Sequence, residues 1–284
     1  MVKTYTTELA GRPLVMEFGK YCGQANGSVI VRLGDTVVMV NATASDTPRE
    51  GQDFFPLSVD FEEKMYSVGK IPGGFIKREG RPSEKATLTS RLIDRPLRPL
   101  FNKGMRNDVQ VVATVLSVEQ DVPPDIPAML GASAAIAVSD IPWAGPIGGV
   151  SVGLVDGEIV INPDQAQREV SKLSLTVAGT DEAVLMVEAG AKEISEADML
   201  RAILTGHEEI KKLVAFQKQI VAEIGKEKRV FPIAETGEDV KAAVRADFFD
   251  RCAWAFEAFD RHERSAREEQ VKQEAHELYA ERFE

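Results

Sequence analysis

Apolar and polar residues alternate in several short segments of the chain, a pattern typical of strands with one buried face. Residues 28–43 predict two strands joined by a turn at Gly34 and Asp35. Residues 148–161 predict a hairpin that turns at Asp156 and Gly157, a pair that favours tight turns. Further strands are expected at 54–61, 108–118, 173–178 and 183–188.

Other segments repeat their apolar residues every three or four positions, which indicates amphipathic helices. Ser195 is expected to begin a long helix that ends near Gly225, and a small-residue helix is expected over 128–139. Ser83 is a candidate N-cap for a helix that should end near Asp94, because proline disfavours the helical conformation of the residue before it. Strands followed by interspersed helices favour an α+β fold with a mixed or antiparallel sheet.

The last part of the chain differs in composition from the rest. Residues 226–237 have the charge and the Pro and Gly content of a connector, and residues 238–284 are acidic and helical in pattern. The aromatic stripe of that tail is expected to form its packing core: Phe248, Phe249, Ala253, Phe256 and Phe259. We therefore expect a core domain at residues 1–230 and a helical domain at residues 236–284.

Charge is distributed unevenly. The 284 residues contain 34 Lys and Arg against 45 Asp and Glu, a net charge of −11. Residues 64–106 nevertheless contain eleven basic and only three acidic residues, a local charge of +8. A basic island on an acidic protein attracts a polyanion, whereas the alternative interpretation is a solvated basic face.

Several classes of protein are disfavoured by what the sequence lacks. It contains no apolar run of the ~20 residues that span a bilayer and no N-terminal signal peptide. The only histidines are His207, His262 and His276, so chemistry in the first 206 residues cannot use imidazole. Two distant cysteines form neither a zinc cluster nor a disulfide framework, which favours the reducing cytoplasm.

Three arginines stand out within the basic island. Arg91 and Arg95 are four residues apart and would share one face of a helix, and Arg98 follows three residues later. Guanidinium groups bind phosphate oxygens in a bidentate fashion, so these three arginines suit successive phosphates of a nucleic-acid strand. Asp94 is expected to pair with one of them. A kinase or another nucleotide enzyme is a competing interpretation, but neither Gly-rich phosphate-binding motif is present.

The basic segment and its surroundings resemble bacterial polynucleotide phosphorylase. The resemblance lies in the loop KIPGGFIKREGRPSE at 70–84 and in RLIDRPLRPLF at 91–101. It extends to LVMEFGK at 14–20, DFEEKMY at 60–66 and PPDIPAM at 123–129. It implies a first ribonuclease-PH-like core at residues 1–230 and part of an all-helical linker domain at 236–284. The final residues contain no helix stop, which favours a chain that continues in its natural form.

The resemblance also implies an activity. Members of this family degrade single-stranded RNA from the 3′ end with inorganic phosphate as co-substrate, release nucleoside diphosphates in mRNA turnover and require Mg²⁺. They form homotrimeric rings and can associate with RNA degradosome components. The family's phosphate pocket and metal ligands belong to a second core that this sequence lacks, so the isolated chain is expected to be inactive and its catalytic residues stay unknown. In the corresponding stretch here, residues 121–128, Asp125 would repel phosphate and the prolines lack amide donors.

The chain is expected to bind single-stranded RNA. Neither DNA nor a membrane is expected as a partner. The resemblance places an aromatic and basic loop at Phe75, Lys77 and Arg78, where Phe75 would stack a base. It also directs Arg91, Arg95 and Arg98 toward the RNA. In the competing interpretations, Phe75 only anchors its loop, and the arginines form salt bridges inside the core. A non-catalytic, ring-forming RNA-binding subunit of the same fold is the alternative function.

Overall fold

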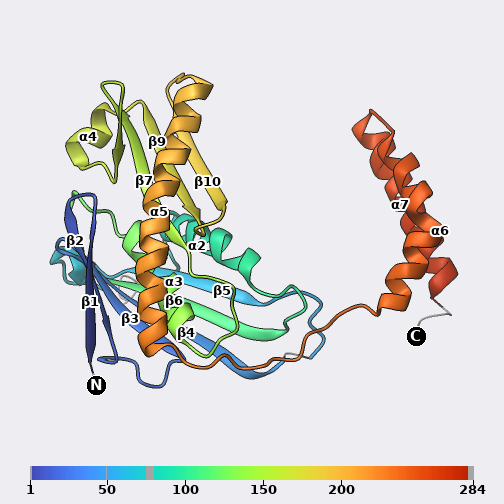
Figure 1. Ribbon diagram of the computed structural model, residues 1–284, viewed down its shortest axis with the longest axis horizontal. Coiled ribbons are helices and arrows are strands. Elements are labelled where there is room, and N and C mark those ends of the chain that lie inside the picture. Colours follow the sequence, from blue (N-terminus) through green and yellow to red (C-terminus); the bar gives the residue numbers. More distant parts are fainter. Residues whose placement is uncertain (1, 49, 75–79, 281–284) are drawn as a thin grey trace. The chain divides into compact units, whose positions relative to one another are not determined.

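The computed structural model describes residues 2–48, 50–74 and 80–280. The chain divides into two compact units, Met1–Ile233 and Ala234–Glu284 (Figure 1). The first unit contains both β-sheets, and the second is helical. The boundary falls within the segment whose composition suggested a connector.

The first sheet has six strands in the order β1-β2-β3-β4-β6-β5. All neighbours are antiparallel except β5 and β6, which are parallel. The strands are β1 (Lys3–Leu9), β2 (Arg12–Phe18), β3 (Gly27–Leu33), β4 (Thr36–Pro48), β5 (Leu57–Glu63) and β6 (Asn107–Ser117). The strands expected over 28–43, 54–61 and 108–118 are confirmed within a few residues, whereas β1 and β2 were not expected.

The second sheet is smaller and fully antiparallel, with the order β10-β9-β7-β8. Its strands are β7 (Gly148–Val155), β8 (Glu158–Ile161), β9 (Leu173–Gly179) and β10 (Val184–Ala191). Asp156 and Gly157 both have positive φ angles, 51° and 85°, as a tight hairpin turn requires. The predicted hairpin is therefore confirmed, and the two sheets with their helices confirm the α+β class.

The helices of the first unit are α2 (Glu84–Leu97), α3 (Asp125–Val138), α4 (Gln165–Val170) and α5 (Glu196–Ile224), with 3₁₀ turns at Met65–Val68 and Arg98–Leu100. Ser83 and Ser195 are N-caps, because each hydroxyl accepts a backbone N–H at 3.1 Å. The expected end of α2 near Asp94 is wrong, since Pro96 lies inside the helix. Pro96 and Leu97 are both buried, and that burial holds the last turn in place.

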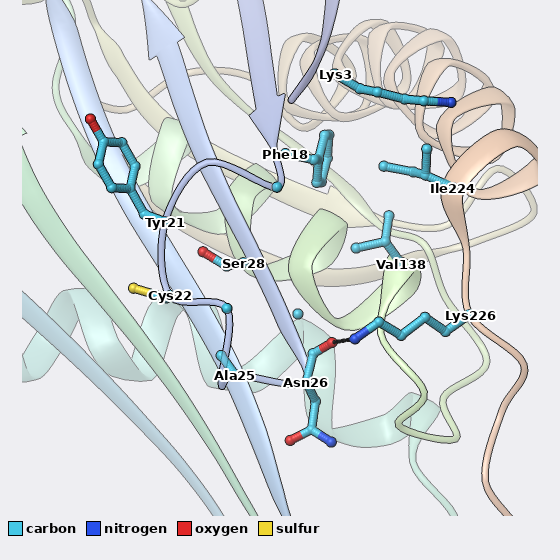
Figure 2. A pocket seen from close by; sticks show the side chains of 13 residues that line it. Lys3, Phe18, Tyr21, Cys22, Ala25, Asn26, Ser28, Val138, Ile224 and Lys226 are labelled. Atoms are coloured by element: carbon cyan, nitrogen blue, oxygen red, sulfur yellow. Dashed lines mark hydrogen bonds between the residues drawn. The ribbon is translucent and has the colours of Figure 1, made fainter. Parts of the chain in front are cut away.

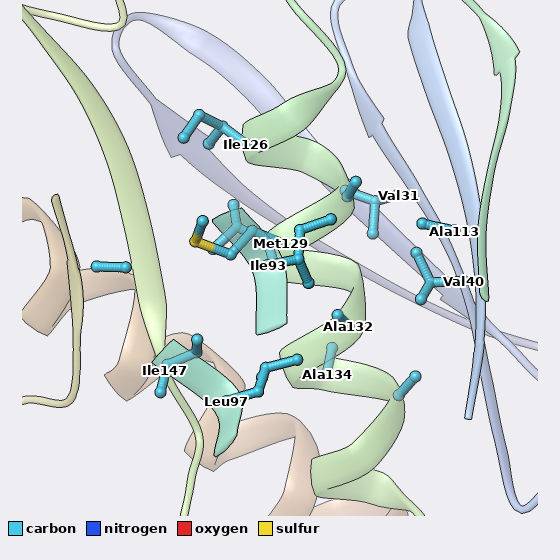
Figure 3. Close-up of a cluster of buried hydrophobic side chains, with 14 of the residues drawn as sticks. Val31, Val40, Ile93, Leu97, Ala113, Ile126, Met129, Ala132, Ala134 and Ile147 are labelled. Atoms are coloured by element: carbon cyan, nitrogen blue, oxygen red, sulfur yellow. The ribbon is translucent and has the colours of Figure 1, made fainter. Parts of the chain in front are cut away.

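Helix α3 forms the centre of the first unit. Every residue from Ile126 to Val138 is buried, and the helix packs on β3 and β4 of the first sheet and on β7 of the second. Figure 3 shows its apolar side chains directed to both sides. Gly131 lies against Val40 and Val31, where a larger side chain would collide with the sheet. The small residues at 131–135 allow this close approach.

The segment that follows α5 is packed on the core rather than free. The backbone N–H of Lys226 donates to Val138 O, and that of Arg229 donates to Asp140 O. The Lys228 ammonium donates to three carbonyl oxygens at the end of α3: Ile136 (3.0 Å), Ala137 (2.9 Å) and Ser139 (2.6 Å). Ile136 O also accepts from the backbone N–H and the hydroxyl of Ser139. Carbonyls in the last turn of a helix lack some of their intrahelical partners, so the lysine acts as a further C-terminal cap.

The second unit consists of α6 (Glu238–Phe256) and α7 (Arg261–Tyr279). Phe248 packs edge-on against Tyr279, and Arg251 forms a bidentate ion pair with Glu274. The expected aromatic core is wrong for most of the stripe, because Phe249, Phe256 and Phe259 are 59%, 67% and 103% exposed. A pair of helices buries only the faces that they share, and among these phenylalanines that face includes Phe248 alone.

Candidate functional site

The outward face of α2 carries the two arginines that share a helical face. Arg91 and Arg95 are both exposed. Arg91 makes no hydrogen bond or ion pair with any residue that the structure describes. Arg95 donates from Nη1 to Glu188 of β10 at 2.9 Å, and both side chains are about half exposed. The guanidinium group of Arg91 is therefore directly accessible to a ligand, and a ligand reaches Arg95 when it replaces the Glu188 carboxylate.

Arg98 has a different environment. Its Nε and Nη2 atoms donate to the Asp94 carboxylate at 2.9 and 2.7 Å, which confirms the expected Asp94–arginine pair. Nη1 and Nη2 also donate to the carbonyl oxygens of Phe55 and Leu57 at 3.3 and 3.1 Å. Leu57 begins β5, an edge strand, so Arg98 satisfies exposed backbone at that edge. These internal partners agree with the competing interpretation of Arg98 as a structural residue.

Phe75, Lys77 and Arg78 lie outside the described residues, and their assignment to RNA binding stays a prediction. The basic island also includes Lys85, which pairs with Glu63 at 2.8 Å. Its remaining exposed cations include Arg81 and Lys103. Among the described residues of the island, Arg91 and Arg95 are the cations that α2 presents together on its surface.

The start of α3 is the place where the resemblance locates the lost phosphate pocket. Asp125 occupies the first position of the helix, and its Oδ1 atom is buried without a hydrogen-bond partner among the described residues. Burial raises the pKa of this carboxyl, while the backbone amides of Ile126 and Asp125, and more weakly Lys85 and Arg168, act in the opposite direction. A carboxyl of the chain itself thus faces the amides that would otherwise bind an anion.

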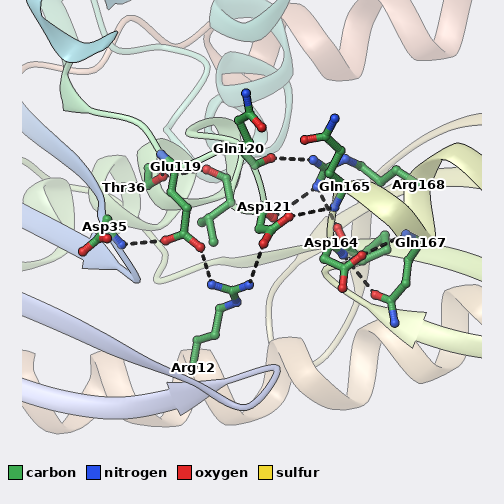
Figure 4. Close-up of polar contacts among 12 residues, drawn as sticks. Arg12, Asp35, Thr36, Glu119, Gln120, Asp121, Asp164, Gln165, Gln167 and Arg168 are labelled. Carbon is green, nitrogen blue, oxygen red and sulfur yellow. Dashed lines mark hydrogen bonds and ion pairs between the residues drawn. The ribbon is translucent and has the colours of Figure 1, made fainter. Parts of the chain in front are cut away.

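A polar network that the sequence did not reveal holds the loop before α3 (Figure 4). Arg12 reaches Glu119 at 2.5 Å and Asp121 at 3.7 Å. Arg168 donates to the carbonyl oxygens of Gln120 and Pro163, both at 2.7 Å, and to Asp121 O at 3.2 Å. Arg12 is therefore paired with carboxylates, whereas Arg168 is held in place by backbone carbonyls and keeps its positive charge.

A separate hollow of about 300 Å³ lies near the other end of α3 (Figure 2). Phe18, Tyr21, Cys22 and Val138 line it. Its two lysines are engaged, because Lys226 donates to Asn26 O at 2.7 Å and Lys3 pairs with Glu223. This hollow brings together no acid–base pair and no nucleophile with an adjacent base.

The resemblance places the Mg²⁺ ligands in a second core, so the Mg²⁺ requirement stays a prediction. Within residues 2–48, 50–74 and 80–280, no group of three or more His, Cys, Asp or Glu side chains is placed to hold a metal ion. Asp125 stands alone at the start of α3, so no catalytic step of this chain is assigned to a metal. No helix in the described part is long and apolar enough to cross a membrane.

Comparison with known families matches two adjacent domains. Residues 10–142 match domain 1 of the 3′ exoribonuclease family, and residues 145–209 match domain 2. The first match covers most of the larger sheet and α3, and the second covers the smaller sheet and the first half of α5. A crystal structure of Rrp46 from rice has the same fold: its TM-score is 0.58 at 16% identity, over 78% of this chain and 94% of that one.

Curated relatives are much closer in sequence. A polyribonucleotide nucleotidyltransferase of Clostridioides difficile is 58% identical over 272 residues, which is 96% of this chain and 39% of the relative. A relative of the same name from Heliobacterium modesticaldum is 57% identical over 93% of this chain and 37% of its own length. These matches confirm the resemblance noted in the sequence. The chain spans about two fifths of the length of these relatives.

Proposed function

Because the chain belongs to the 3′ exoribonuclease family, we propose that it takes part in the 3′-to-5′ phosphorolytic degradation of single-stranded RNA. In that reaction inorganic phosphate cleaves the terminal nucleotide and a nucleoside diphosphate leaves. The chain supplies the first ribonuclease-PH-like core, and its contribution is to hold the RNA. The relatives named polyribonucleotide nucleotidyltransferase support the activity for the whole protein, of which the chain corresponds to about two fifths.

The observation that carries this proposal is the accessible pair of guanidinium groups on α2. Arg91 has no partner among the described residues, and Arg95 has only an exposed one, Glu188. An exposed ion pair is worth about 0.2–1 kcal/mol, so an RNA phosphate can replace Glu188 at small cost. Phosphates of a flexible single strand can then bind both arginines, and Phe75, Lys77 and Arg78 would extend the contact.

The chain by itself does not hold a complete phosphorolytic pocket. The Asp125 carboxyl stands at the helix start where phosphate would bind, and the described residues offer no metal-binding group. We therefore assign the phosphate and Mg²⁺ sites to the second core of the whole enzyme. Incubation of the chain with single-stranded RNA, phosphate and Mg²⁺ tests this: no nucleoside diphosphate is expected, and robust release would contradict the assignment.

The RNA-binding role is tested by the salt dependence of affinity. Binding of a labelled oligouridylate, measured by fluorescence anisotropy, should weaken with salt with a log–log slope of about −0.7 per phosphate contact. Arg91→Gln and Arg95→Gln should each lower the affinity and flatten the slope by about 0.7. Arg201→Gln on α5 is the matched control, because Arg201 is 52% exposed and pairs with Asp198 at 3.0 Å, much as Arg95 is 51% exposed and pairs with Glu188. An unchanged slope in both α2 variants would remove this face from the RNA-binding surface.

A non-catalytic, ring-forming RNA-binding subunit is the second candidate. Both candidates bind RNA. They differ in that the whole protein releases nucleoside diphosphate only if the first candidate is correct. A homotrimeric ring and a location in the cytoplasm are further expectations from the resemblance. Light scattering on the purified chain would report its oligomeric state.

A further inference from the structure

The hollow of about 300 Å³ near the C-terminal end of α3 lies within the first unit (Figure 2). Segments that are distant in sequence line it: residues 18–28, which lead from β2 into β3, the last residue of α3, and the junction of α5 with the connector. A cavity of about 150 Å³ holds a benzene molecule, so this space accommodates an aromatic ring with a short side group. No residue of α2 or of the start of α3 lines it.

One wall of the hollow is apolar. Phe18, Val138 and Ile224 form it, and Figure 2 shows their side chains grouped together. Phe18 is 5% exposed, and the ring of Tyr5 packs edge-on against it with 6.0 Å between the centroids. Packing with Tyr5 thus fixes the Phe18 ring independently of anything in the hollow. Aromatic rings pair in edge-to-face or offset-stacked arrangements, so this wall suits a second aromatic ring.

The opposite character is supplied by two lysines. Lys3 and Lys226 line the hollow, and its described lining residues include no Asp or Glu. Lys3 pairs with the exposed carboxylate of Glu223. Lys226 instead donates to a neutral group, the backbone carbonyl oxygen of Asn26, at 2.7 Å. An ammonium group has three N–H donors, so Lys226 keeps its charge and has donors left for a ligand.

The C-terminal ends of α3 and α5 also reach the hollow, and such ends carry partial negative charge that disfavours an anion. At α3 this charge is compensated. The Lys228 ammonium donates to three carbonyl oxygens at the helix end, and the backbone N–H of Lys226 donates to Val138 O. At α5 the backbone N–H of Gly225 donates to Val221 O. The hollow therefore keeps the positive charge of its side chains.

We propose that this hollow is a binding site for a small aromatic carboxylate. The ring lies against Phe18, Val138 and Ile224, and the carboxylate accepts hydrogen bonds from the Lys226 ammonium. A small hydrophilic anion such as phosphate would gain nothing from the apolar wall. A neutral apolar molecule would leave the Lys226 charge without a partner. A single carboxylate on an aromatic ring uses both walls, since bonds between charged groups are stronger than those between neutral groups.

NMR titration of the ¹⁵N-labelled 284-residue chain with 3-phenylpropanoate tests the proposal. Saturable shifts of the backbone amide signals are expected, and the largest should occur in residues 18–28 and at the ends of α3 and α5. Two analogues separate the contributions. 3-Phenylpropan-1-ol keeps the ring without the charge, and propanoate keeps the charge without the ring. Each should bind about tenfold more weakly than 3-phenylpropanoate, or worse.

Substitutions of Lys226 test the position of the carboxylate. Lys226→Gln removes the charge and should weaken 3-phenylpropanoate binding about tenfold, whereas Lys226→Arg keeps the charge and should retain most of the affinity. Lys218→Gln is the matched control and should leave the affinity unchanged. Lys218 is exposed, lies outside the lining of the hollow and donates to one oxygen at 2.7 Å, as Lys226 does. Thermal melts of each variant establish that it is folded.

Four results would each overturn the proposal. The first is the absence of saturable shifts, and the second is an unchanged affinity in Lys226→Gln. Equal affinity for the alcohol would assign a purely apolar hollow, and equal affinity for propanoate would assign a general anion site. The hollow shares no residue with the RNA-binding face of α2, so failure of this proposal and failure of the RNA-binding proposal are distinguishable.

Discussion

Replacement of Gly131 by alanine should destabilise the first unit, although alanine is the better helix former. A Cβ atom at this position would lie 2.6 Å from Cγ2 of Val40 and 3.0 Å from Cγ2 of Val31. Both valines are fully buried in strands of the first sheet. Their β-branched side chains have little freedom to rotate away, so helix α3 or the sheet must shift.

The magnitude follows from two opposing contributions. Overpacking of a well-packed core costs about 1–3 kcal/mol, and replacement of a helical glycine by alanine contributes about 1 kcal/mol in the other direction. Because the neighbours are rigid, we expect a net loss of about 1–2 kcal/mol. Gly206→Ala on α5 is the matched control: its Cβ would meet Val152, Val150 and Val177 at 3.2–3.5 Å, a milder crowding, so the same change there should cost less stability than at Gly131.

Urea unfolding followed by Trp143 fluorescence measures this difference. A Trp254→Phe background removes the signal of the helical unit, so the transition reports the first unit alone. Val40→Ala removes the methyl that Gly131→Ala would strike, and the double variant should therefore lose less stability than the sum of the two single changes, by about 1 kcal/mol or more. Equal stability of the Gly131→Ala and Gly206→Ala proteins, or additive effects in the cycle, would refute the close-packing argument.

Three further predictions concern stability. Burial raises the pKa of the Asp125 carboxyl. The contribution of this carboxyl to stability is therefore complete below its unfolded-state pKa and is lost as pH rises through its folded-state pKa. Asp125→Asn should raise the melting temperature at pH 7, and the gain should shrink toward pH 4. Lys228→Met removes the cap at the end of α3 and should lower the free energy of unfolding, measured by chemical denaturation, by about 1–3 kcal/mol. An unchanged free energy of unfolding would show that water replaces the ammonium without loss. Ser83→Ala removes the N-cap of α2 and should cost about 1 kcal/mol, whereas Ser83→Asp should retain most of the stability; equal losses in both variants would argue against capping.

Local patterns explain why much of the fold was predictable from the sequence. The hairpin at Asp156 and Gly157 and the helix starts at Ser83 and Ser195 depend on residues within one turn of each other. Strands β1 and β2 were missed because β1 contains few apolar residues and owes its place to pairing with β2. The stop expected before Pro96 failed for a similar reason, since burial of Leu97 outweighs the local preference.

The sequence by itself determined the composition of the site: the basic island, the arginines at 91, 95 and 98, and the acidic residue at the start of α3. Only the tertiary structure decided their environments. Arg98 is engaged by carbonyls of Phe55 and Leu57, some forty residues away in the chain, while Arg91 has no partner in the described part. Oδ1 of Asp125 is buried without a hydrogen-bond partner in the described part, although the residue stands at the start of a helix. Charge is a property of the residue, but solvent exposure and partners depend on contacts between distant segments.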